Sequence, residues 1–323
     1  MENLSQSTVF EWLNSESSMS YRTGEQRFSR HVETQFPSTS LRYRILFSDN
    51  SGLAAIEDWL LCNTTELSLA LITRNNELTC IEVCAAEALN FAALKTLSCV
   101  EVFQVKADAP VLNQPGLLVM DMDSTAIEIE CIDELAEMAG VGAAVAAVTE
   151  QAMQGELDFE ESLRARVAKL NNADADIIQR LCAKLPLMPG LTAMVAELKQ
   201  YQWRTVVASG GFTPFVNHLK QLLDLDAAFA NELDIAEGKL LGTVSGQVVD
   251  AQFKADTVES SAKQWSIAMG QRVAIGDGAN DIPMINIADF GIAYHAKPKL
   301  AVVADVNIDK LNLKVLPYLF QLK

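Results

Sequence analysis

The sequence predicts an α/β protein in which an open, doubly wound parallel sheet carries a helical cap insertion and follows a small α+β domain. Short apolar segments alternate with helical patterns in the C-terminal two thirds, which is typical of parallel strands covered on both faces. These segments are Leu117–Met120, Thr205–Ala208, Val273–Ile275 and Phe290–Ala293. A long helical stretch without a strand pattern, residues 132–200, separates the first two. The N-terminal third has another order of elements, which indicates a separate domain.

The first domain is assigned to residues 1–110, of which residues 1–40 show no pattern clear enough for an assignment. From residue 42 the order is strand, helix, strand, strand, helix, strand, with expected bounds of 42–47, 53–61, 66–73, 78–83, 86–97 and 100–106. This order is the split βαβ arrangement of a ferredoxin-like domain. The breaker-rich segment Asp108–Gly116 places the domain boundary near residue 110.

The second domain is assigned to residues 111–323. Three of its four predicted strands end in polar or glycine-rich residues, and ligands of open α/β sheets bind beyond the carboxyl ends of the strands. We therefore expect one pocket shared by these strand ends. The helical insertion, at about residues 132–200, is expected to cover that pocket as a cap.

Composition limits the classes of function. A net charge of −17 over 323 residues disfavours binding to nucleic acid, and no basic patch offsets it. The first residues, Met1–Gln6, lack the basic and then apolar pattern of a secretory signal, so none is expected, and no apolar run approaches the roughly 18 residues of a membrane span. The six cysteines include no CxxC pair. We expect a cytoplasmic protein with reduced cysteines and with no nucleic acid or membrane partner.

The strongest signal for chemistry is the pair Asp121 and Asp123, directly after the apolar strand Leu117–Met120. Alternate residues of an extended segment share a face, so both carboxylates are expected to point the same way. Asp121 can attack a phosphoryl group and carry it as an aspartyl-phosphate. Asp123 can protonate the leaving alkoxide and then activate water. An acidic turn that only caps a helix or aids solubility is the alternative.

Two further elements can bind a phosphoryl group. Ser209, Gly210 and Gly211 follow the second apolar strand, where a hydroxyl and the backbone N–H groups at a helix start can receive phosphoryl oxygens. Lys254 can neutralise the charge of a metaphosphate-like transition state. The alternatives are a tight turn that needs glycine and a solvated surface lysine.

The segment Gly276–Asp281 completes the set and predicts a magnesium site. Asp277 and Asp121 are the expected direct ligands, since Mg²⁺ is bound by few carboxylates and keeps several waters. Asp281 is expected to orient a metal-bound water, and Asn280 to donate to the phosphate or the substrate. The alternative is an acidic, glycine-containing turn that caps the next helix.

In this order, the four elements resemble the haloacid dehalogenase (HAD) superfamily of aspartyl-phosphate phosphatases, and within it the bacterial phosphoserine phosphatases. The resemblance covers about residues 115–300 and is carried by Asp121–Glu134, Phe159–Val167, Ser209–Phe212 and Gly276–Asp281. It implies a HAD-like fold with a cap. It also implies that magnesium is bound by the side chains of Asp121 and Asp277 and by the backbone carbonyl of Asp123.

The resemblance further implies substrate contacts from Glu130, Met153, Phe159, Arg166, Ser209, Lys254 and Asn280. Charge agrees for two of these residues, because O-phosphoserine carries a carboxylate that suits the planar fork of Arg166 and an ammonium that suits Glu130. Without the resemblance, Arg166 is as well explained as a surface arginine paired with Glu161, and Glu130 as a solvated carboxylate at a helix start.

The expected function is magnesium-dependent hydrolysis of O-phosphoserine to serine and phosphate through phospho-Asp121, the last step of serine biosynthesis. Hydrolysis or phosphotransfer with another small phosphorylated metabolite is the alternative within the enzyme class. A receiver-like signalling domain is disfavoured, because it needs neither the acid/base Asp123 nor a long cap. The first domain resembles small ACT-like ligand-binding modules that also pair subunits. Amino-acid sensing and a homodimer therefore stay open.

Overall fold

In the computed structural model, which describes residues 2–3, 18–22, 27–30, 41–48, 50–62, 66–74 and 77–322, the chain divides into two units. Unit 1 contains Met1–Ala109 and Ile308–Lys323, and unit 2 contains Pro110–Asn307. None of the described helices combines the length and the apolar composition that crossing a membrane requires.

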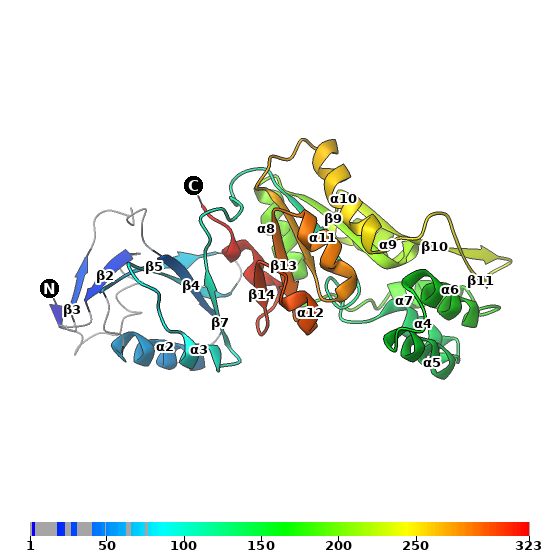
Figure 1. Ribbon diagram of the computed structural model, residues 1–323, viewed down its shortest axis with the longest axis horizontal. Helices are drawn as coiled ribbons and strands as arrows, with labels where there is room; N and C mark the ends of the chain where they lie inside the picture. The colour runs from blue at the N-terminus through cyan, green and yellow to red at the C-terminus, as the bar shows by residue number, and fades with distance from the viewer. Residues whose placement is uncertain are drawn as a thin grey trace. The chain divides into compact units, whose positions relative to one another are not determined.

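Unit 1 is built on an antiparallel sheet with the strand order β1-β3-β2-β5-β6-β4-β7. Its strands are β1 (Glu2–Asn3), β2 (Ser18–Arg22), β3 (Arg27–Arg30), β4 (Leu41–Phe47), β5 (Glu66–Thr73), β6 (Thr79–Ala85) and β7 (Val100–Gln104). Helices α2 (Asn50–Cys62) and α3 (Ala92–Lys95) lie on the same face of this sheet (Figure 1). Leu60 of α2 and Leu94 of α3 join Ile45 and Ile81 of the sheet in one buried apolar core. The predicted order of strand, helix, strand, strand, helix, strand is confirmed.

Two details of unit 1 differ from the prediction. The helix expected at 86–97 is limited to α3, because Asn90 uses its polar groups outside a helix. Its Oδ1 accepts the N–H of Ala92 at 2.9 Å, and its carbonyl accepts the indole N–H of Trp59 at 2.8 Å. Strands β1, β2 and β3 lie within residues 1–40, for which the sequence predicts no element, and they extend the sheet beyond β5.

The end of the chain belongs to unit 1, which corrects the predicted extent of the second domain, 111–323. Arg44 of β4 donates to the carbonyl oxygens of Tyr318 and Phe320, in the C-terminal segment that includes the 3₁₀ helix η4 (Leu313–Leu319). Arg44 is buried and pairs with buried Glu82 at 3.0 Å. A buried guanidinium therefore fixes the returning chain to the first sheet.

We expect Arg44→Met to destabilise unit 1 by about 3 kcal/mol, because removing one partner of a buried ion pair leaves the other charge uncompensated. Arg42→Met is the matched control. Arg42 approaches the same carboxylate of Glu82 at 3.6 Å, but its side chain is 35% exposed, and exposed pairs contribute about 1 kcal/mol or less. Denaturant unfolding followed by circular dichroism measures the free energy of unfolding of both variants. Equal losses in the two variants would show that Arg44 has no special role.

Unit 2 is built on a second sheet with the order β11-β10-β9-β8-β12-β13-β14. Its strands are β8 (Leu117–Met120), β9 (Arg204–Phe212), β10 (Ala227–Ala236), β11 (Lys239–Ser245), β12 (Arg272–Gly276), β13 (Phe290–Tyr294) and β14 (Val306–Ile308). Strands β10, β9, β8, β12 and β13 are parallel, and β11 forms an antiparallel hairpin with β10. The four predicted strands are β8, β9, β12 and β13. The predicted α/β fold is confirmed.

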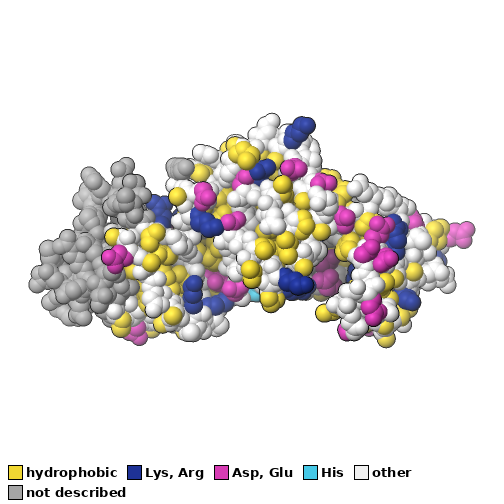
Figure 2. Space-filling view, viewed as in Figure 1, with side chains coloured by type: hydrophobic (Ala, Val, Ile, Leu, Met, Phe, Trp, Pro, Cys, Tyr) yellow, Lys and Arg dark blue, Asp and Glu magenta, His cyan; other side chains and the backbone are white. Residues whose placement is uncertain are grey.

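The helices of unit 2 fall into two groups. The first group forms the cap and gathers beyond the sheet (Figure 1), with α4 (Cys131–Met138), α5 (Gly142–Met153), α6 (Phe159–Lys169) and α7 (Asp176–Cys182). Figure 2 shows acidic side chains gathered over this group. The second group accompanies the strands, with α8 (Leu191–Gln200), α9 (Thr213–Leu223), α10 (Ala251–Gln264), α11 (Ile282–Ile287) and α12 (Pro298–Ala301).

Helix α8 corrects the predicted cap, which extends to about residue 200. It packs against β9 and α9 rather than with the cap helices. Parallel neighbours such as β8 and β9 need a crossover connection, which is usually a helix on the sheet, and α8 fills that role. The hairpin of β10 and β11 was not predicted, and its strand β11 packs against α6 of the cap.

Candidate active site

The carboxyl ends of β8, β9 and β12 surround one cavity of about 140 Å³. Nine residues predicted from the sequence line it, namely Asp121, Asp123, Glu130, Phe159, Arg166, Gly210, Gly211, Asp277 and Asn280. Three more predicted residues, Ser209, Lys254 and Asp281, are buried and bonded to lining residues. Segments far apart in the sequence thus meet at the strand ends, where ligands of parallel sheets bind.

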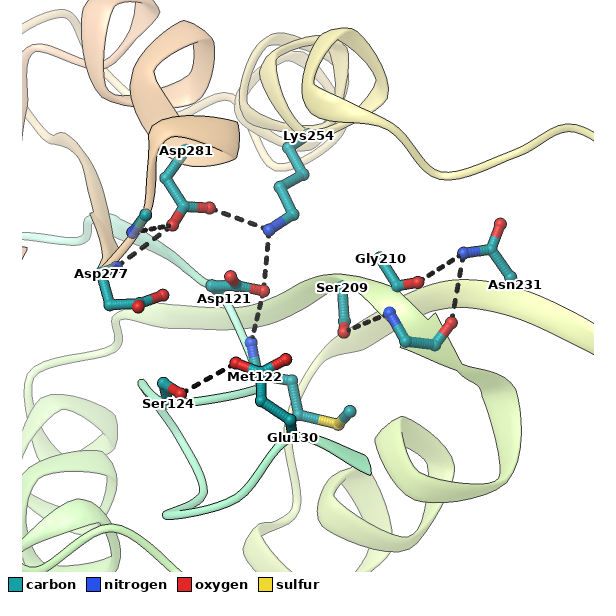
Figure 3. Close-up of polar contacts among 12 residues, drawn as sticks. Asp121, Met122, Ser124, Glu130, Ser209, Gly210, Asn231, Lys254, Asp277 and Asp281 are labelled. Atoms are coloured by element: carbon teal, nitrogen blue, oxygen red, sulfur yellow. Dashed lines mark hydrogen bonds and ion pairs between the residues drawn. The ribbon is translucent and has the colours of Figure 1, made fainter. Parts of the chain in front are cut away.

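Asp121 is fixed by the strand before it and by a lysine from another element. Its N–H donates to the carbonyl of Ile275 in β12 at 3.0 Å, so its backbone is anchored to the neighbouring strand. Its Oδ1 accepts the N–H of Met122 at 2.7 Å and lies 2.8 Å from Lys254 Nζ (Figure 3). Burial, and then the charge of Asp281, raises the pKa of Asp121 well above its ordinary value.

Lys254 is placed in the first turn of α10. The N-terminus of this helix is fixed by Asp250, whose Oδ1 accepts the N–H of Phe253 at 2.8 Å. Lys254 Nζ lies 2.8 Å from Asp281 Oδ1 as well as from Asp121. Burial disfavours the ammonium, yet the two carboxylates raise the pKa of Lys254 above its ordinary value. Lys254 therefore carries a fixed positive charge beside Asp121.

Asp121, Asp277 and Asp281 form a buried acidic cluster in which one oxygen of each carboxylate lies within 4.8 Å of the other two. Asp281 Oδ2 accepts the N–H groups of Asp277 and Gly278 at 3.1 and 3.0 Å, and its Oδ1 accepts Lys254 (Figure 3). Three carboxylates around one buried ammonium leave an excess of negative charge. Oxygen donors of this kind suit a hard divalent cation, so the residues fit a metal site.

Asp123 links the strand end to the cap. Its Oδ1 accepts the N–H of Cys131, the first residue of α4, at 3.0 Å. Burial, and then the charge of Glu130, raises the pKa of Asp123 to about 7. A carboxyl with such a pKa exchanges its proton near neutral pH, as an acid/base group must. A Cβ on Gly211 would lie 2.9 Å from Asp123 Oδ2, so glycine at that position allows this close approach.

The segment Ser209–Gly211, here called the phosphate loop, differs in one respect from the prediction. Gly210 and Gly211 line the cavity, but Ser209 is fully buried and its Oγ accepts the N–H of Gly211 at 2.9 Å. Its hydroxyl therefore supports the loop and does not line the cavity. The loop is also held by Asn231, which the sequence did not indicate, because β10 itself was not predicted.

Glu130 and Arg166 bring opposite charges to the cavity from the cap. Glu130 precedes α4, and its Oε1 accepts the hydroxyl of Ser124 at 3.0 Å. Arg166, half-buried on α6, donates from Nε to the carbonyl of Ser162 at 3.4 Å. The alternative pairing with Glu161 is not formed, since that carboxylate accepts the N–H of Asp158 in the capping box of α6.

One predicted residue lies away from the cavity, and one residue that the sequence did not indicate lines it. Met153, expected at the closed pocket, ends α5 with its side chain 80% exposed and does not line the cavity. Lys297 was not predicted, yet it lines the cavity and lies 3.4 Å from Asp277 Oδ2. It follows β13, so a fourth strand end with a basic residue is the signal that could have indicated it.

Comparison with known proteins agrees with this geometry. The family model of haloacid dehalogenase-like hydrolases matches residues 116–289. Phosphoserine phosphatase of Haemophilus influenzae is 53% identical over 218 residues, which are 67% of this chain and 69% of that protein. The unliganded crystal structure of a probable phosphoserine phosphatase from Vibrio cholerae superposes with a TM-score of 0.74, 38% identity, and coverage of 88% and 91% of the two chains. A substrate-bound phosphoserine phosphatase structure matches with a TM-score of 0.60, 39% identity, and coverage of 65% and 99%.

Proposed function

The chain belongs to the haloacid dehalogenase-like hydrolase family, and from this premise we propose that it hydrolyses O-phosphoserine to serine and phosphate. The observation that carries the proposal is the single cavity in which Asp121 and Asp123 meet Glu130 and Arg166. The first pair suits phosphoryl transfer. The second pair suits the ammonium and the carboxylate of an amino acid. A phosphorylated metabolite that lacks the ammonium and the carboxylate would offer Glu130 and Arg166 no oppositely charged group.

Mg²⁺ is the cation that we propose for the acidic cluster. The side chains of Asp121 and Asp277 and the backbone carbonyl of Asp123 would hold it. Asp281, whose oxygens already bind Lys254 and two N–H groups, would orient a water bound to the ion. When bound, the ion supplies positive charge to the oxygens of the phosphoryl group.

We propose two displacements at phosphorus. In the first, an oxygen of Asp121 attacks, the bond between phosphorus and the serine oxygen breaks, and Asp123 gives its proton to that oxygen. In the second, Asp123 takes a proton from a water whose oxygen attacks phosphorus. The bond to Asp121 then breaks and phosphate leaves. The ammonium of Lys254, 2.8 Å from Asp121, offsets charge on the transferred group.

The remaining predicted residues would position the substrate. Gly210 and Gly211 present the phosphate loop to the phosphoryl group, with Ser209 as its support. Asn280 and Phe159, both at the cavity, would contact the phosphate and cover the substrate respectively. Met153 would need a movement of the cap to reach the substrate, because it is exposed at the end of α5.

Phosphate release from a panel of phosphomonoesters tests the proposed substrate. The panel contains both enantiomers of phosphoserine, phosphothreonine, phosphoethanolamine and sugar phosphates, each with Mg²⁺. We expect L-phosphoserine to have the highest kcat/KM. Comparable kcat/KM for sugar phosphates would favour the alternative, a HAD phosphatase for another small metabolite.

Arg166→Ala is expected to raise the KM for phosphoserine about 10- to 100-fold, since a charged hydrogen bond contributes about 1.5–3 kcal/mol. Phosphoethanolamine lacks the carboxylate, so its kcat/KM is expected to stay within about twofold. Arg164→Ala is the control on the same helix. Arg164 is 46% exposed and pairs with Glu160 at 2.7 Å, away from the lining residues. An equal loss on both substrates would indicate a structural role for Arg166.

We further propose that the protein is cytoplasmic and that it forms a homodimer paired through unit 1. The antiparallel sheet with both helices on one face supports the homodimer, because ACT-like modules of this arrangement also pair subunits. Light scattering after size-exclusion chromatography measures the mass in solution. A monomer at micromolar concentration would contradict the homodimer.

A further inference from the structure

The side chain of Asn231, on β10, is bonded to the phosphate loop. Its Nδ2 donates to the carbonyl oxygens of Gly210 at 2.8 Å and Gly211 at 3.2 Å (Figure 3). Asn231 is 1% exposed. A buried polar side chain on a strand is unfavourable unless its hydrogen bonds are made, so this amide indicates a specific task.

The pairing of β9 with β10 is irregular at the phosphate loop. Ala208 pairs with Phe229 and Phe212 pairs with Asn231, so the three residues of the phosphate loop lie opposite the single residue Ala230. The loop therefore bulges out of the ladder, and the regular strand pairing is broken there. The amide of Asn231 supplies hydrogen bonds to two carbonyl groups in the bulge. Without it, these carbonyls would lose a partner beside the cavity.

The same amide also reaches the helix that carries Lys254. Asn231 Oδ1 accepts the N–H of Val249 at 2.8 Å. Val249 immediately precedes Asp250, the N-cap residue of α10, and Lys254 lies in the first turn of that helix. One side chain thus connects the phosphate loop, which contributes Gly210 and Gly211 to the cavity wall, with the start of the helix whose Lys254 pairs with Asp121.

We propose that Asn231 is a positioning residue for phosphate recognition, which holds the Gly210–Gly211 and Gly211–Phe212 peptide groups at the wall of the cavity and sets their distance from α10. The proposal rests on the proposed phosphatase function and deepens it. Its consequence is that losing the two donor bonds weakens the binding of phosphate itself, beyond any loss of stability.

The test compares two isosteric substitutions of buried amides. Asn231→Asp keeps the acceptor for Val249 but replaces the donor with an oxygen facing the carbonyls of Gly210 and Gly211. Gln271→Glu makes the same change where the amide donates to the carbonyl of Val111 at 3.0 Å and accepts its N–H at 2.6 Å. Gln271 is 4% exposed and does not line the cavity. Both variants therefore replace a buried amide with a carboxyl group at similar burial. Only the change at Asn231 affects a side chain that is bonded to the phosphate loop.

Binding of inorganic phosphate is measured by calorimetry with Mg²⁺ present, at a temperature where circular dichroism shows each variant folded. We expect Asn231→Asp to weaken phosphate binding about tenfold or more and to raise the KM for phosphoserine similarly, since unsatisfied buried groups cost about 1–3 kcal/mol. Gln271→Glu should stay within about twofold for both, although its melting temperature falls. Asn231→Ser, which retains a small donor without adding charge, should lie between wild type and Asn231→Asp.

The outcomes separate this proposal from the proposed function. A wild-type protein that neither hydrolyses phosphoserine nor binds phosphate contradicts the function. A wild-type protein that does both, with phosphate binding unchanged in Asn231→Asp or weakened equally in Gln271→Glu, contradicts the role of Asn231 alone. If Asn231→Asp does not fold, the phosphate binding of Asn231→Ser is compared with that of wild type and of Gln271→Glu instead. Failure of both Asn231 variants to fold, while Gln271→Glu folds, contradicts a positioning role that is separate from stability.

Discussion

Asp121→Asn is expected to reduce phosphoserine hydrolysis on the order of 10⁵-fold or more, because an amide oxygen is too weak a nucleophile to form the phosphoenzyme. The substitution also removes the charge that faces Lys254 at 2.8 Å. Phosphate release at saturating substrate measures the loss. Asp256→Asn, on the exposed face of the helix that carries Lys254, is the control and should leave turnover unchanged.

The fold of the variant is checked by its melting curve. The removal of a nucleophile is expected to leave far less than about 1% of the wild-type rate. If a folded Asp121→Asn protein keeps more than about 1%, another group attacks phosphorus.

Asp123→Asn is expected to lower kcat for phosphoserine about 10²- to 10⁴-fold, the usual contribution of a positioned acid or base. Its effect on KM should be small, because an asparagine Oδ1 can still accept the N–H of Cys131 and the backbone carbonyl is unchanged. An amide cannot give a proton to the serine oxygen or take one from water.

A substrate with a better leaving group separates the two steps for Asp123→Asn. With p-nitrophenyl phosphate the first step needs little protonation, so a burst of nitrophenolate should precede slow turnover. Near-full turnover of phosphoserine by the variant would contradict the acid/base role of Asp123.

The parts of the fold that could be predicted are those with local signals. The strands β8, β9, β12 and β13 are short apolar segments, and parallel topology brings their ends together. Asp121, Asp123 and Asp277, which the sequence predicts at the strand ends, line the cavity. Local spacing was enough in these cases because each side chain follows directly from the strand that carries it.

The parts that could not be predicted depend on partners far away in the sequence. Asn231 acts on Gly210 and Gly211 through a bulge, and its own strand, β10, mixes buried and half-exposed residues without a clear alternation. The return of the C-terminal segment to unit 1 involves Arg44, which donates to two carbonyl groups at the other end of the chain. Neither contact has a periodicity that a single sequence displays.

The extent of the cap and the position of Met153 differ from the prediction for a similar reason. Helical pattern alone does not distinguish α8, which crosses over the sheet to β9, from α4 to α7, which form the cap. Met153 was expected at the pocket through the resemblance, but it ends α5 with an exposed side chain. Which helix face meets the cavity is a tertiary property, because it depends on how neighbouring helices pack.

Between the two proposed displacements, Asp121 carries the phosphoryl group. The most direct measurement is mass spectrometry of the Asp123→Asn enzyme, quenched in acid during turnover of p-nitrophenyl phosphate with Mg²⁺, alongside the Asp121→Asn/Asp123→Asn double variant. A single added phosphoryl group on Asp121 in the first sample, absent from the second, is the expected result. Phosphate release with no phosphoryl group on Asp121, or with one on another residue, would contradict the account.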